Sequence, residues 1–131
     1  MVRAGGAVAV FDGDYASWSF GCSDPDLGTA MEEALTATAV SKPRVLRDMP
    51  RQLRDAGLTL VASRAHVYAE IGRGRFFLGQ AEVFAPLVAR AGLLPAAKVE
   101  AWLAEQRTAS AQDTFFAACN YYSFVARRPA A

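Results

Sequence analysis

The chain has 131 residues, of which 53% are hydrophobic and 21% charged, and its formal net charge is +1. This balance is typical of one folded domain with a sizeable core, and it excludes a disordered chain. The small net charge gives no reason to expect nucleic acid or an anionic membrane as a partner.

The sequence has two cysteines, Cys22 and Cys119, and neither belongs to a Cys-x-x-Cys pair. This pattern predicts free thiols in a reducing compartment and no zinc site. No apolar run reaches the roughly 20 residues of a membrane span. Residues 1–6 lack the apolar region of a secretory signal. We therefore expect a cytoplasmic protein, with residues 1–131 forming a single domain, no metal and no membrane partner.

Residues 7–11 form an apolar run between Gly5-Gly6 and the acidic segment Asp12-Gly13-Asp14. Such a run predicts a strand buried on both faces. In open α/β sheets ligands bind at the carboxyl ends of the strands, so Asp12 and Asp14 are expected at a functional edge. The alternative is that both carboxylates only cap a turn.

Residues 15–22 carry three aromatic side chains, Tyr15, Trp18 and Phe20, among small residues. The segment fits neither a helical nor a strand period, so we predict a loop. Aromatic residues in a loop at the end of a strand line an apolar pocket or cover the edge of the core, and the sequence leaves both open.

Two helices are predicted next. Ser23 or Asp24 caps a helix over residues 25–40, which has Pro25 in its first position. Asp48 caps a second, shorter helix that ends at Gly57, with Leu58 packing back against it.

Residues 59–71 predict a strand with an irregularity near Ser63-Arg64. It contains the only histidine, His66, which is either structural or available for proton transfer. The following Gly72-Arg73-Gly74-Arg75 lacks the third glycine of a dinucleotide-binding loop, so it predicts a flexible turn with solvated arginines.

Residues 80–90 predict a helix, and Pro95 opens another. Their expected inward faces are Val83, Phe84, Leu87 and Val88 in the first, and Val99, Trp102, Leu103 and Gln106 in the second. Residues 114–127 predict the last strand. Strands joined through helices favour an α/β sheet. With only three strands, the first would expose an apolar, unpaired edge.

Several segments together carry a resemblance. They are Ala4-Gly5-Gly6 before the first strand, Leu53-Arg54-Asp55-Ala56-Gly57-Leu58 at the end of the second helix, Trp102-Leu103 in a helical insertion, and Phe115 through Arg128-Pro129 as the last strand and tail. In this order they resemble the carboxyl-terminal half of a class I S-adenosylmethionine-dependent methyltransferase of the ubiquinone/menaquinone-biosynthesis type. The tail departs from the family pattern in lacking its glycine.

The resemblance implies a partial Rossmann-like methyltransferase sheet of about three strands, with the last strand antiparallel between the other two. It implies a cofactor, S-adenosyl-L-methionine, whose glycine-rich loop and ribose-holding carboxylate belong to the other half and are not in this chain. The implied function is therefore the substrate-side portion of a small-molecule methyltransferase, inactive alone. Its partners would be a missing amino-terminal half or a second copy. The alternative is a non-catalytic α/β interaction module or a truncated remnant.

The expected sheet geometry selects the candidate substrate residues. The two parallel strands would end near Asp12 and His66, and the antiparallel strand would begin at the same edge. No catalytic or cofactor-binding residue is assigned. The candidates are Asp12, Asp14, Tyr15, Trp18, Phe20, His66, Tyr68, Phe115 and Phe116.

Overall fold

A computed structural model describes residues 2–130. In chain order the elements are β1 (Ala7–Phe20), α1 (Pro25–Ala39), the short 3₁₀ helix η1 (Val45–Asp48), α2 (Met49–Asp55), β2 (Thr59–Gly72), α3 (Phe76–Arg90), α4 (Ala96–Ala111) and β3 (Phe115–Arg127). Within residues 2–130, no helix combines the length and apolar character needed to cross a membrane.

The three strands form one sheet in the order β1-β3-β2. β3 runs antiparallel to both neighbours, and its Arg127 is opposite Ala7 on one side and Thr59 on the other. The predicted α/β class is thus confirmed, with the last strand antiparallel between the other two and a helical insertion, α3 and α4, before it. The irregularity of β2 lies between Leu60 and Ala62, slightly earlier than predicted.

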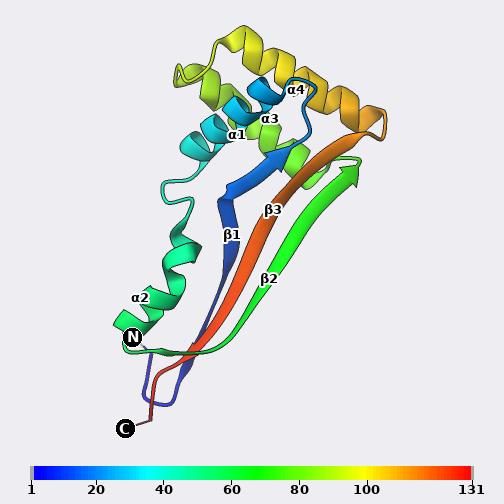
Figure 1. Cartoon of the computed structure of the whole chain (residues 1–131). Helices are drawn as coiled ribbons and strands as arrows, with labels where there is room; N and C mark the ends of the chain where they lie inside the picture. The colour runs from blue at the N-terminus through cyan, green and yellow to red at the C-terminus, as the bar shows by residue number, and fades with distance from the viewer. Residues whose placement is uncertain (1, 131) are drawn as a thin grey trace.

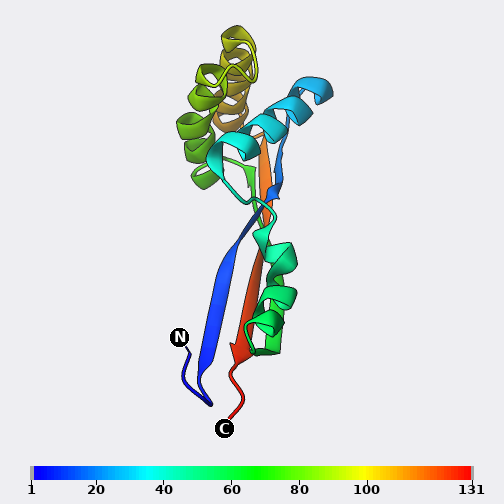
Figure 2. The ribbon, with the colours of Figure 1, turned by 90° about the vertical axis from the view of Figure 1, so that its left-hand side faces the viewer.

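Helices cover the two faces of the sheet at opposite ends (Figures 1 and 2). At one end α1, α3 and α4 share a core with Phe115, Ala117 and Cys119 of β3. At the other end η1 and α2 pack on Phe124 and Ala126. Side chains of a strand alternate between faces, so these two sets point in opposite directions. Figure 2 shows the sheet nearly edge-on, with α2 on one side and α3 on the other.

The start of α1 and the end of α2 follow the predicted capping residues. The predicted cap at the start of α2 is wrong, because the Asp48 carboxylate makes no cap hydrogen bond and pairs with Arg51 instead. The Asp24 carboxylate accepts hydrogen bonds from the backbone N–H groups of Asp26 and Leu27, at 3.0 and 3.2 Å. After α2, Gly57 adopts a φ of +73°, and the N–H of Leu58 donates to the carbonyl of Leu53 at 2.9 Å. This is the glycine-terminated helix end expected from the sequence.

The predicted inward face of α4 is confirmed, whereas that of α3 is partly wrong. Val99, Trp102, Leu103 and Gln106 are all buried. In α3 the buried residues are Phe77, Ala81, Ala85 and Val88, while Val83 is 61% exposed. The helix starts earlier than predicted because the Glu70 carboxylate accepts hydrogen bonds from the N–H groups of residues 75, 76 and 77.

The predicted loop over residues 15–22 is wrong, because β1 continues to Phe20. Its pairing with β3 is interrupted between Asp14 and Ser19 and then resumes. Ser17 stabilises the irregular segment: its hydroxyl donates to the carbonyl of Asp14 at 2.6 Å and accepts from the N–H of Asn120 at 2.9 Å. The interruption breaks the period-2 pattern, and so it hid the strand in the sequence.

The prediction that residues 7–11 form a strand buried on both faces is also wrong. Val8 and Val10 are half-buried against the core under α2, but Phe11 on the opposite face is 64% exposed. Within residues 2–130, β1 hydrogen-bonds to β3 alone, so its other edge is unpaired. An apolar run is therefore covered on one side only.

Candidate functional site

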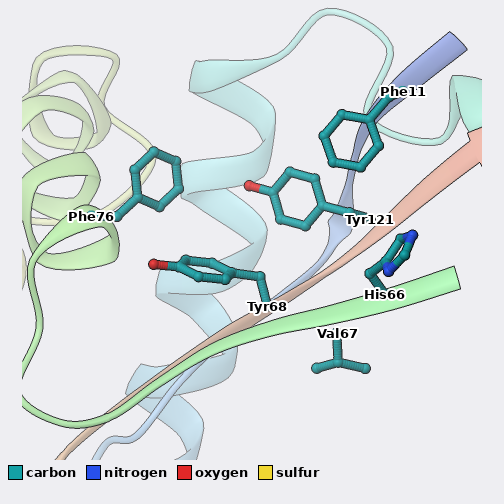
Figure 3. Close-up of a pocket in the computed structure, with 6 residues that line it drawn as sticks. All are labelled: Phe11, His66, Val67, Tyr68, Phe76 and Tyr121. Atoms are coloured by element: carbon teal, nitrogen blue, oxygen red, sulfur yellow. The ribbon is translucent and has the colours of Figure 1, made fainter.

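An open groove lined mainly by aromatic side chains crosses the sheet on the face that α2 does not cover (Figure 3). Its volume is about 420 Å³. All three strands and the start of α3 contribute to it. The lining residues are Phe11, His66, Val67, Tyr68, Phe76 and Tyr121.

Strand register brings these side chains together. Tyr121 of β3 is opposite His66 on β2 and opposite Gly13 on β1. Tyr68 is two residues beyond His66 and therefore on the same face. Val67 points to the other side of β2, as Figure 3 shows. The groove is thus a direct consequence of the alternation along three adjacent strands.

Gly13 makes room for the aromatic rings. A Cβ atom at this position would approach the rings of Tyr121 and Tyr15 to 3.2 Å each. Tyr121 then stacks on Phe11, with ring centroids 5.7 Å apart and planes 19° apart. Tyr68 meets Tyr121 edge-on at 6.4 Å. These offset and edge-to-face arrangements are favourable for aromatic pairs and give the groove flat walls.

The phenols of Tyr121 and Tyr15 remain protonated at neutral pH. Burial, with Cys119 and Tyr15 nearby, raises the pKa of Tyr121 to about 12. Burial, and then the Asp12 carboxylate, also raise the pKa of Tyr15. The Tyr15 hydroxyl donates to Asp12 Oδ1 at 3.2 Å. Tyr121 therefore offers a neutral hydroxyl to a ligand rather than a phenolate.

Asp14 has a different role from the predicted one. Its side chain is 2% exposed, and its Oδ2 accepts from Nε and Nη2 of Arg47 at 2.9 and 2.8 Å. Asp14 also lies on the face opposite the groove, in register with Asn120. The expectation that Asp14 lies at a strand end is wrong, because β1 continues past it. Its carboxylate is paired with Arg47 of η1.

The remaining candidates fall in four places. His66 and Tyr68 line the groove, whereas Asp12 and Tyr15 hydrogen-bond to each other and are not among its lining residues. Phe116 is 42% exposed, on the face opposite Phe115. Buried in the core are Trp18, Phe20 and Phe115. The sequence predicts these residues at one sheet edge, but β1 continues to Phe20 instead of ending at Phe11, and the candidates are spread along the sheet.

Four lining residues were missed. Phe11 was assigned to a buried run, Val67 and Tyr121 to the interiors of two strands, and Phe76 fell between the predicted turn and the predicted helix. Period-2 alternation in residues 115–127 could have placed Tyr121 on the same face as Phe115 and Cys119. Nothing in the sequence showed that this part of the face has no helix over it.

The described residues hold neither a metal cluster nor a cofactor loop. Residues 2–130 contain no group of three or more His, Cys, Asp or Glu side chains placed to bind a metal ion. The space beside Gly74 is filled by the protein itself, because a Cβ there would lie 2.7 Å from the Phe115 ring. Gly74 therefore packs against the core, and this turn leaves no open cradle beside Gly74 for a cofactor.

Comparison with known proteins adds no assignment. No model of a protein family matches the chain, and no curated protein matches it by sequence.

Proposed function

We propose that this chain is the substrate-side portion of an S-adenosylmethionine-dependent methyltransferase for a small molecule, and that a separate cofactor-binding half completes it. The observation that supports this most is the strand order β1-β3-β2, in which a reversed last strand separates two parallel ones. This is the order that the sequence resemblance implies. The free thiols of Cys22 and Cys119 favour a reducing cytoplasm as its location.

The exposed surfaces support a missing half. β1 has an unpaired edge, and unpaired apolar edges are usually covered in folded proteins. Phe11 beside that edge is 64% exposed on the groove face. An exposed aromatic side chain next to an unpaired strand edge is a candidate contact for another chain. In the proposed complex the second half covers the β1 edge, and the groove in Figure 3 becomes an enclosed substrate pocket.

The first experiment identifies and adds the second half. The coding DNA immediately upstream is read for a segment with a glycine-rich loop after a buried strand. That segment and this chain are then produced separately, and calorimetry measures S-adenosylhomocysteine binding to each and to the mixture. We expect saturable micromolar binding only in the mixture. Micromolar binding to this chain alone, or none to the mixture, would refute the proposal.

A matched pair of variants tests the docking face. Phe11→Asp puts a charge on the exposed face beside the β1 edge, and Val83→Asp puts one on α3, where Val83 is 61% exposed. We expect the first to weaken assembly with the second half by about tenfold or more, equivalent to ~1.4 kcal/mol, and the second to leave it unchanged. Equal effects would show that this face is not where the halves meet.

A second candidate is a pairing module without catalysis, and the unpaired edge of β1 with the exposed Phe11 favours it. In that case the chain would form a stable homodimer that buries Phe11, with no cofactor binding in any mixture. Sedimentation equilibrium of the chain and of Phe11→Asp separates the two functions. The pairing module is supported if the chain forms a dimer, Phe11→Asp dissociates it, and calorimetry detects no binding of S-adenosylhomocysteine.

A further inference from the structure

A second cavity lies beside α1. It shares no lining residue with the groove, and its lining carries more polar and charged side chains. Two neighbouring hollows of about 520 and 470 Å³ share Ala16, Thr36, Pro43 and Arg44, and so form one cleft. The cleft lies between the irregular part of β1, the side of α1 and the linker to η1. We call it the α1 cleft.

The backbone interruption in β1 creates this cleft. Where pairing with β3 is lost, the Tyr15 carbonyl accepts a hydrogen bond from the Thr36 hydroxyl at 3.2 Å, which ties α1 to the strand. Ala16 is common to both hollows, and its small side chain leaves the centre open. Trp18 lines one end, is 5% exposed and has no hydrogen-bond partner for Nε1 in residues 2–130.

The walls of the α1 cleft carry both signs of charge. Glu32 and Glu33 project from α1, and Lys42 and Arg44 belong to the linker. Within residues 2–130 none of these four side chains belongs to an ion pair. The fifth charged residue of the lining, Asp48, is already paired with Arg51 at 2.9 Å. Two anions and two cations therefore line one cleft without neutralising each other directly.

Glu32 is the most constrained of the four. One carboxylate oxygen accepts from the N–H of Phe20 at 2.8 Å, which fixes the side chain. Burial raises the pKa of this carboxyl, so its charged form is poorly solvated. A cationic group in the cleft would relieve that cost, and the indole of Trp18 adds a surface that favours cations and apolar groups.

From this arrangement we infer that the α1 cleft binds a small zwitterion of the α-amino acid type. The ammonium group contacts Glu32 and Glu33, the carboxylate contacts Arg44 and Lys42, and an apolar side chain lies over Ala16 toward Trp18. A dianion would be repelled by the two glutamates, and a dication by the linker cations. A ligand with one charge of each sign complements both walls.

The test uses the isolated chain and L-leucine as the probe, followed by amide chemical shifts in NMR titrations. We expect saturable shifts of residues 16, 36 and 44 at millimolar ligand. N-acetyl-L-leucine lacks the ammonium and L-leucinamide lacks the carboxylate, and each should bind about tenfold more weakly or worse. Equal binding of all three, shifts confined to the groove around Phe11, or no saturable shifts would overturn the inference.

Variants connect the binding to named residues. Glu32→Gln keeps an acceptor for Phe20 but loses the charge, and Arg44→Gln removes an exposed cation. Each should weaken L-leucine about tenfold, whereas Glu100→Gln on the exposed side of α4 should change nothing. Undiminished binding in both cleft variants would contradict the inference. The titrations require neither cofactor nor second chain, so their failure leaves the methyltransferase proposal to be judged by its own assembly experiment. Excess L-leucine in that experiment removes any contribution of the α1 cleft to S-adenosylhomocysteine binding.

Discussion

Replacing Gly74 by alanine tests how tightly the turn between β2 and α3 is packed. The added Cβ would lie 2.7 Å from Cε1 and 2.9 Å from Cδ1 of Phe115, and 2.9 Å from Cβ of Leu78. Phe115 is 1% exposed and cannot move without disturbing the core. The turn is also fixed on the other side, because the N–H of Gly74 donates to the Ser110 hydroxyl of α4 at 3.1 Å.

The expected magnitude combines two opposing effects. Forcing an extra carbon into a packed core costs about 1–3 kcal/mol. Losing the flexibility of glycine in the unfolded chain returns about 0.4–1 kcal/mol. Gly74→Ala should therefore destabilise the fold by roughly 1–2 kcal/mol, which for a chain of this size lowers the melting temperature by about 4 °C per kcal/mol.

Gly79 provides a matched control five residues away. It lies within α3, and a Cβ there would meet nothing within 4 Å. Gly79→Ala should stabilise the fold by about 0.5–1 kcal/mol, since alanine is the better helix former. Urea unfolding followed by far-ultraviolet circular dichroism measures both variants. Changes of the same sign, or a neutral Gly74→Ala, would refute the packing described for this turn.

Three further predictions concern buried groups. Trp102→Ala should lower the free energy of unfolding by about 3–5 kcal/mol, since the side chain is fully buried; an unchanged urea midpoint would make α4 peripheral. Because the folded-state pKa of Tyr121 is about 12 and an unfolded tyrosine titrates near 10, wild type should lose stability relative to Tyr121→Phe as the pH rises between those values. A stability difference between the two proteins that does not change with pH would contradict this prediction. The raised pKa of Glu32 predicts that Glu32→Gln gains stability relative to wild type as the pH rises above about 4.3, and a relative loss would be the contrary result.

Most helix ends could be predicted from the sequence because they depend on local signals, whereas the strand order was predicted from the family resemblance. Asp24 with Pro25 predicted the start of α1, and Gly57 predicted the end of α2. The start of α3 was missed because its capping group, Glu70, lies on the preceding strand. The end of β1 was missed because a local interruption of pairing removed the alternation that identifies strands.

The candidate site was harder to predict because it depends on which part of the sheet has no helix packed over it. His66 and Tyr68 were selected for their position near a strand end, and they do line the groove. Phe11 was not selected, because an apolar residue in an apolar run is normally buried. Whether a face is covered depends on where distant helices pack, and here α2 and α3 pack on opposite faces. Residue spacing alone does not contain that information.

The central strand of the sheet is also the last to be synthesised. Neither β1 nor β2 has a strand partner until residues 115–127 exist, because each hydrogen-bonds to β3 and not to the other. On the ribosome, a nascent chain that already contains β1 and β2 must wait with the hydrogen-bonding edges that pair with β3 still unpaired. Pairing across so many intervening residues is slow, and such intermediates are prone to aggregate. Yield in cells should therefore depend on chaperones and on growth temperature, and a ribosome stalled before residue 115 should present a chain that proteases cut readily.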